Sequence, residues 1–185
     1  MEQNNLGIVF NVVGRKLPEA GIEFIMIGGH AVNHYGYSRA TIDIDFMIAA
    51  SDMSVVRSVM KDSGFSNISE SENVVFFEHP DIPYRVDFLQ IDSGSMQKLL
   101  AHAERIDYAG ISLKVPSLKD LLSMKLFALK HGSERREEKD FPDIVNLVIE
   151  HGLELENELK PLCEKFADTQ IYVKLAERIR RLKHD

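Results

Sequence analysis

Two aspartates stand in an apolar stretch of the sequence that is expected to form a buried strand. In TIDIDFMIAA, residues 41–50, Asp43 and Asp45 alternate with apolar residues. Successive side chains of a strand point to opposite faces, so the two carboxylates should share one face, with Cα atoms roughly 6.5 Å apart. The residues expected to point into the core on the other face are Ile42, Ile44, Phe46 and Ile48. Burying carboxylates is costly unless something pairs with them.

A divalent metal ion is one such partner. Magnesium prefers oxygen ligands and usually binds through one or two carboxylates together with substrate phosphates. The alternative is a solvated, inert pair at an exposed strand end. Asp87, in YRVDFLQI, is a third acid inside an apolar strand. If that strand lies beside residues 41–50, three carboxylates converge, as two-metal phosphoryl chemistry requires.

The residues around the aspartate strand suit a phosphate ligand. Gly28 and Gly29 follow a strand expected over 22–27 and precede a short helix, where backbone N–H groups can approach phosphate closely. Arg39 could bind phosphate through its planar fork or pair with a nearby acid. Thr41 could fix the backbone just before the strand.

The composition describes an ordinary globular protein. Of 185 residues, 44% are apolar, and the formal charge is −7, which argues against general coating of nucleic acid but allows a local basic patch. The C-terminal ERIRRLKHD is such a cluster, either a solvated helix face or a contact for a nucleic-acid acceptor. The single cysteine, Cys163, excludes an intrachain disulfide, and we expect it to be a packed thiol.

The hydrophobic pattern predicts an α+β protein. Beyond the strands already named, strands are expected over 74–78 and 84–91 and a hairpin over 105–115, whereas the residues after Pro116 read as successive helices. We therefore expect an α/β core over residues 1–115 and a helical segment over 116–185 packed on that core. The N-terminal apolar run is too short for a signal peptide or membrane span, so a cytoplasmic protein is expected.

The stretch GGHAVNHYGYSRATIDIDF, with the later acid Asp87, resembles the signature of the DNA polymerase β-like nucleotidyltransferase superfamily. The pattern is most similar to that of small bacterial nucleotidyltransferase-like proteins, including toxin components of toxin–antitoxin pairs. MKLFALKHGSERREEKDFPDIVNL resembles their later helical stretch, and the match covers most of residues 22–149. The resemblance implies a mixed central β-sheet flanked by helices and an antitoxin as a partner.

The resemblance also implies an activity, in which a nucleoside monophosphate moves from a nucleoside triphosphate to an acceptor hydroxyl and pyrophosphate leaves. Asp43 and Asp45 would bind two magnesium ions, and Asp87 would bind the catalytic ion and help to deprotonate the acceptor. Gly28 and Gly29 would hold the triphosphate. Many members carry serine where this chain has Gly29, so a hydroxyl contact to phosphate would be missing here.

Further residues remain open between two roles. Lys125 would face the phosphates by the resemblance, but it could equally be a lysine that snorkels from an amphipathic helix. Lys139, Asp140 and Asp143 match the family's KD..D element, for which a structural ion-pair role is expected. His30 and His34 could share a helix face and bind zinc, although a role for His30 in lining the nucleotide pocket is preferred.

A second hypothesis belongs to another class, a module that retains the fold and binds a nucleotide or a partner without catalysis. The presence of all three acids argues against it, since binding alone does not require them. The sequence leaves the acceptor open among a small molecule, a protein hydroxyl and a tRNA end, and predicts no membrane partner.

Overall fold

The computed structural model describes residues 5–108, 110–132 and 134–184, and the chain divides into two compact units. The sheet unit comprises Met1–Ala31 and Arg39–Ser117, and the helical unit comprises Val32–Ser38 and Leu118–Asp185. The division passes through one short helix, α3 (Gly28–His34). The predicted packing of the C-terminal segment on the core stays a prediction.

A mixed five-stranded sheet organises the sheet unit. Its spatial order is β1-β2-β5-β4-β3, and β2 pairs with β5 in parallel whereas the other neighbours are antiparallel. The strands are β1 (Phe24–Met26), β2 (Asp43–Ala49), β3 (Ser66–Glu70), β4 (Val74–His79) and β5 (Ile82–Ile91). This sheet with its helices confirms the predicted α+β class.

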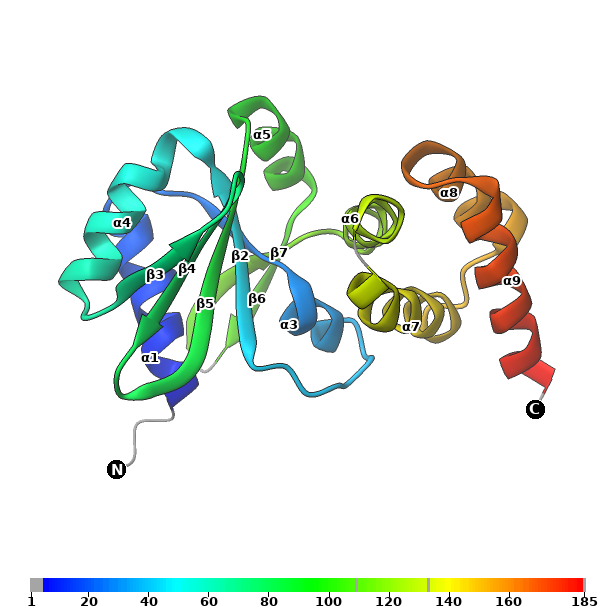
Figure 1. Cartoon of the computed structure of the whole chain (residues 1–185), viewed down its shortest axis with the longest axis horizontal. Helices are drawn as coiled ribbons and strands as arrows, with labels where there is room; N and C mark the ends of the chain where they lie inside the picture. The colour runs from blue at the N-terminus through cyan, green and yellow to red at the C-terminus, as the bar shows by residue number, and fades with distance from the viewer. Residues whose placement is uncertain (1–4, 109, 133, 185) are drawn as a thin grey trace. The chain divides into compact units, whose positions relative to one another are not determined.

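Helices and a hairpin accompany the sheet. The helical stretch at the start of the chain consists of α1 (Asn5–Asn11), η1 (Val12–Lys16) and α2 (Leu17–Glu19). Four of its apolar residues recur at helical spacing and are all buried: Leu6, Phe10, Val13 and Leu17. The other helices are η2 (Ala50–Asp52), α4 (Met53–Asp62) and α5 (Ser93–His102), and β6 (Glu104–Tyr108) pairs with β7 (Ile111–Val115) as the predicted hairpin. In Figure 1, α1 and α4 lie along one face of the sheet.

The strand boundaries correct two expectations. Ile44, Phe46 and Ile48 are buried as predicted, but Ile42 lies before the first residue of β2 and is 71% exposed. Its expected place in the core was wrong because the regular strand begins at Asp43. The second correction is the strand β3, which the sequence analysis did not predict and whose five residues are all exposed. Its sequence SNISE lacks the apolar alternation by which a half-buried strand is detected.

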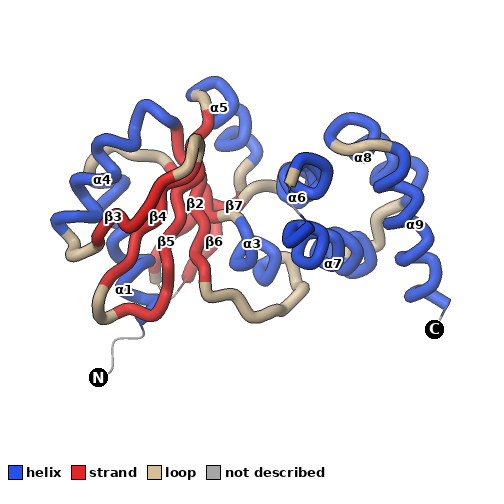
Figure 2. The backbone as a smooth tube through the Cα atoms, viewed as in Figure 1, coloured by secondary structure: helices blue, strands red, loops and turns tan. Residues whose placement is uncertain are grey.

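Every regular element of the described chain from Leu118 onward is a helix, as Figure 2 shows. The helices are α6 (Leu118–His131), α7 (Glu134–Glu150), η3 (Leu155–Leu159), α8 (Lys160–Phe166) and α9 (Thr169–His184). Cys163 is buried in α8, and burial raises the pKa of its thiol to about 12, which confirms a packed thiol. No helix in the described ranges is long and apolar enough to cross a membrane.

Candidate active site

The three predicted acids lie on neighbouring strands of the sheet unit. In the parallel register of β2 and β5, Asp45 stands opposite Asp87 and Asp43 stands opposite Arg85. Asp43 and Asp45 are half-buried, whereas Asp87 is only 6% exposed. Because the register pairs these residues directly, the acids share one face of the sheet. The structure therefore shows that the strand of Asp87 lies beside the strand of Asp43 and Asp45, which the sequence analysis could only assume.

The donor set formed by these acids suits a hard cation. Three carboxylates on one face offer the oxygen ligands that magnesium prefers. Within the described ranges, however, no group of three or more His, Cys, Asp or Glu side chains is already arranged to hold a metal ion.

The two glycines lie in the first turn of α3, not in a separate turn before it as expected. Gly28 has φ +65°, and a Cβ added there would collide with the Asp45 carboxylate. A Cβ on Gly29 would lie 2.9 Å from the Thr41 hydroxyl oxygen and 3.2 Å from Nη1 of Arg39. Because neither glycine has a side chain, the start of α3 can lie close to Asp45, Thr41 and Arg39.

The segment before β2 is fixed by a short local network. The Thr41 hydroxyl donates to the Asp43 carbonyl at 3.1 Å, which confirms its predicted role in fixing the backbone. Nη1 of Arg39 donates to the Ala40 carbonyl at 3.4 Å and lies beside Gly29. The Ile27 amide donates to the Asp45 carbonyl at 2.9 Å, which ties β2 to the residue preceding α3.

Arg85 is a site residue that the sequence analysis missed. Its Nε donates to Oδ1 of Asp87 at 2.7 Å and its Nη2 donates to Oδ2 at 2.7 Å, while Nη2 lies 3.3 Å from Oδ2 of Asp43. The hydrogen bond to Asp87 raises the pKa of Arg85. Burial raises the pKa of Asp87, although Arg85 opposes the shift. The signal was present in the sequence, since Arg85 stands two residues before Asp87 and must share its face.

His30 has an enclosed ring nitrogen without a hydrogen-bond partner among the described residues. Its Nε2 is buried and makes no hydrogen bond to any residue that the structure describes, and its ring meets Phe10 edge-on with centroids 6.0 Å apart. Burial, and then the charge of Arg39, lower the pKa of His30, so its neutral form is favoured. The zinc alternative gains no third protein ligand among the described residues.

Lys125 belongs to a buried ion cluster of the helical unit. Its Nζ donates to Oδ1 of Asp140 at 2.8 Å and to Oδ2 of Asp143 at 2.6 Å. Lys125 is 5% exposed and Asp143 is fully buried, so the snorkelling alternative was wrong. The ion-pair role expected of the two acids is confirmed, whereas Lys139 is exposed. A role for Lys125 towards phosphate stays a prediction.

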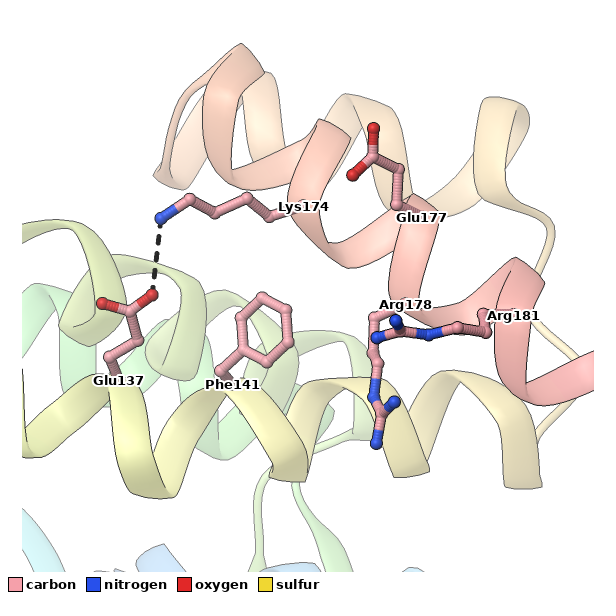
Figure 3. Close-up of a pocket in the computed structure, with 6 residues that line it drawn as sticks. All are labelled: Glu137, Phe141, Lys174, Glu177, Arg178 and Arg181. Atoms are coloured by element: carbon pink, nitrogen blue, oxygen red, sulfur yellow. Dashed lines mark hydrogen bonds and ion pairs between the residues drawn. The ribbon is translucent and has the colours of Figure 1, made fainter.

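The basic C-terminal cluster lies on α9 as far as His184, with Asp185 outside the described residues, and it borders a hollow of about 470 Å³ between α7 and α9 (Figure 3). The hollow is lined by Glu137, Phe141, Lys174, Glu177, Arg178 and Arg181. Lys174 lies 3.4 Å from Glu137 across it, and Arg178 and Arg181 are exposed. The expectation of a solvated helix face is therefore met at these arginines, and a contact to nucleic acid stays a prediction.

Solved structures similar to this chain are nucleotidyltransferases or resemble them. The antibiotic-resistance factor ANT(2'')-Ia has a TM-score of 0.61 at 12% identity, over 100% of this chain and 97% of that one. A nucleotidyltransferase-like antigenic protein from Paracoccidioides brasiliensis gives 0.57 at 21%, over 94% of each chain. The lincosamide antibiotic adenylyltransferase LnuA, bound to lincomycin, gives 0.53 at 16%, over 80% of this chain and 96% of that one. The chain therefore has the nucleotidyltransferase fold.

The sequence itself matches a family within this class. The family described as the nucleotidyl transferase AbiEii toxin of type IV toxin–antitoxin systems matches residues 13–182. The chain belongs to this family, which agrees with the predicted resemblance to the polymerase β-like superfamily and its toxin members. A search of curated proteins finds no match.

Proposed function

We propose that the chain is a magnesium-dependent nucleotidyltransferase that uses Asp43, Asp45 and Asp87. An acceptor hydroxyl attacks the α-phosphorus of a nucleoside triphosphate, the bond to the bridging oxygen breaks, and pyrophosphate leaves. Asp87 accepts the hydroxyl proton, and Asp43 and Asp45, together with Asp87, would hold two magnesium ions. The ions, when bound, stabilise the negative charge of the attacking and leaving oxygens.

The observation that carries the proposal is the register of β2 and β5. It places Asp45 opposite Asp87 on one face while Val86 and Phe88, on either side of Asp87, are fully buried. If the strand were only structural, an apolar residue at position 87 would avoid the cost of burying a carboxylate, which here requires Arg85 as a partner. The cost is understandable if the carboxylate serves a reaction.

The start of α3 is proposed to hold the triphosphate. Gly28 and Gly29 lack side chains that would separate the start of α3 from its neighbours, and Arg39 lies beside Gly29 with a guanidinium that can bind phosphate through two nitrogens. His30 has its enclosed Nε2 unsatisfied among the described residues, and a nucleotide would supply the missing partner. Thr41 holds the segment between these groups and β2, and Lys125 is retained as a candidate phosphate ligand.

The family suggests the partners that we propose for this chain. Nucleotidyl transferases of this kind belong to toxin–antitoxin systems, so an antitoxin is proposed as the protein partner and the cytoplasm as the location. A small molecule, a protein hydroxyl and a tRNA end all remain candidate acceptors. The exposed arginines of α9 favour testing a nucleic-acid acceptor first.

The direct test measures pyrophosphate release from each nucleoside triphosphate with magnesium and a panel of the three acceptor classes. Asp43→Asn and Asp45→Asn should each reduce release by about a hundredfold or more, because each removes a carboxylate from the two-metal site. Asp62→Asn is the matched control, since Asp62 is an exposed aspartate of α4 in the same unit. Near-normal turnover in either site variant would reject the two-metal proposal.

The non-catalytic alternative predicts a different result. A binding module would be stabilised by nucleoside triphosphate and magnesium yet release no pyrophosphate with any acceptor of the panel. Thermal shift and pyrophosphate assays on the same preparations separate the two functions.

A further inference from the structure

Arg85 bridges two of the three acids. The guanidinium binds Asp87 through two parallel hydrogen bonds of 2.7 Å, and the same Nη2 lies 3.3 Å from the Asp43 carboxylate. The β2–β5 register explains this geometry, because it sets Arg85 directly opposite Asp43. One nitrogen of the arginine therefore stands between two of the carboxylates that would hold a divalent cation.

An aromatic side chain holds the guanidinium in this place. The Arg85 guanidinium carbon lies 4.9 Å from the centre of the Phe76 ring, and Phe76 is paired with Asp87 across β4 and β5. Arginine packs well on an aromatic face while its edge donates hydrogen bonds. Phe76 thus supports one face of the guanidinium and leaves its edge to the carboxylates.

The arrangement balances the negative charge of the acid cluster. Asp87 is 6% exposed, and a buried carboxylate beside a second carboxylate requires a nearby cation. The Arg85 side chain is 38% exposed and has solvent on one side, so it can leave this position without unfolding the strand.

We propose that Arg85 is the resident counter-ion of the acid cluster and competes with the divalent cation for Asp43 and Asp87. Binding of the cation displaces the guanidinium from between the two carboxylates. Arg85 is therefore a positioning residue that keeps the acids together before the metal arrives and lowers their affinity for it. This inference rests on the metal-dependent function proposed above.

The test titrates Mn²⁺ into the full-length, nucleotide-free protein and follows free Mn²⁺ by electron paramagnetic resonance. Arg85→Gln should bind Mn²⁺ at least about fivefold more tightly than the wild type, the lower end of common coupling between ligands. The Mn²⁺ affinity of Arg85→Lys should lie between those of the wild type and Arg85→Gln, because lysine keeps the charge but cannot form the two parallel hydrogen bonds. Arg57→Gln is the control, since Arg57 pairs with Glu70 elsewhere in the same unit, and it should leave the affinity unchanged.

Two results would overturn the inference, and they differ from each other. Equal or weaker Mn²⁺ binding by Arg85→Gln, in proteins that do bind the ion, would make Arg85 purely structural and leave the proposed function standing. No Mn²⁺ binding by either protein, in the absence or presence of nucleotide, would reject the metal-dependent function as well.

A second measurement needs no substitution and so does not depend on a folded variant. In the wild type, the Arg85 Nε–H proton is held by Asp87 at an Nε–Oδ1 distance of 2.7 Å and should exchange slowly with water. Saturation with Mg²⁺ should shift this NMR signal and accelerate its exchange as the guanidinium is displaced. An unchanged signal and exchange rate at saturating Mg²⁺ would overturn the inference.

Discussion

Asp87 carries the role that separates an enzyme from a binding module. If it accepts the proton of the acceptor hydroxyl, its contribution is concentrated in the transition state and affects turnover more than nucleotide binding. Asp87→Asn should retain most nucleotide affinity, because Asp43 and Asp45 remain, while transfer falls by about two orders of magnitude or more. Calorimetry for binding and pyrophosphate release for transfer are measured on one preparation.

The substitution is close in shape, since an asparagine side chain can still accept one hydrogen bond from Arg85. Equal losses of affinity and transfer would assign Asp87 to binding or folding. No loss of either would remove Asp87 from the site.

His30 is expected to make the protein sensitive to mild acid. Burial, and then Arg39, lower its pKa from the usual value of 6.5, so the unfolded chain binds the His30 proton more readily than the native protein does. The stability associated with neutral His30 is present above pH 6.5 and is lost as the pH falls towards the native pKa. His30→Gln should flatten this part of the curve of unfolding free energy against pH.

Urea unfolding between pH 7.5 and 5 measures the effect. His131→Gln at an exposed position is the control and should follow the wild type. An unchanged acid slope in His30→Gln would show that the lowered pKa of His30 has no effect on stability.

At the scale of elements, α3 must start close to both β2 and the segment that precedes it. A Cβ at Gly29 would contact Thr41 and approach Arg39, so Gly29→Val should push both away and block backbone approach to phosphate. Nucleotide affinity with magnesium should fall at least about tenfold, which corresponds to about 1.4 kcal/mol. Calorimetry provides the measurement.

Gly7→Val is the matched control, because a Cβ at Gly7 meets nothing within 4 Å. It should leave the nucleotide affinity at the wild-type value. Unchanged affinity in a folded Gly29→Val protein would mean that Gly29 serves structure only.

The helices α6 and α7 are joined by a buried charged cluster. Lys125→Met would leave Asp140 and Asp143 without their shared cation in a buried setting. Breaking a buried pair from one side commonly costs about 3–5 kcal/mol, so the free energy of unfolding should fall by about that amount. Urea unfolding measures the loss, and Lys119→Met, at an exposed position of the same helix, should change little.

A comparison of Lys125→Met with Asp143→Asn tests whether Lys125 binds phosphate. Asp143→Asn should also destabilise the protein, but it keeps the lysine and should preserve nucleotide affinity. If Lys125→Met and Asp143→Asn affect affinity equally, Lys125 has a structural role alone.

At the scale of the whole molecule, the acid cluster predicts that metal and nucleotide stabilise the chain together. A ligand at a hundred times its Kd adds about 2.7 kcal/mol to the free energy of unfolding. For a protein of 185 residues this corresponds to a rise in Tm of roughly 5–10 °C. Calorimetry with nucleoside triphosphate and magnesium should show the rise, and EDTA should reverse it. An equal rise with EDTA present would contradict a metal-dependent site.

The sequence by itself determined the features that consecutive residues encode. Alternation placed Asp43 and Asp45 on one face of a strand, the hydrophobic pattern after Pro116 predicted successive helices, and the paired glycines marked the approach to a ligand. These are local properties, since a strand repeats every two residues and a helix every 3.6 residues whatever surrounds them. The superfamily resemblance rested on the same local pattern, and the match to residues 13–182 confirms it.

The tertiary structure alone decided which residues meet. Strand order and register depend on packing between segments far apart in the chain, and these set Asp87 opposite Asp45 and brought Arg85 to Asp43. The exposed strand β3 escaped detection because sheet pairing, and not apolar alternation, holds it in place. Lys125 pairs with two acids that lie 15 and 18 residues away on another helix. A buried charge requires a partner, and only the tertiary packing determines which residue provides it.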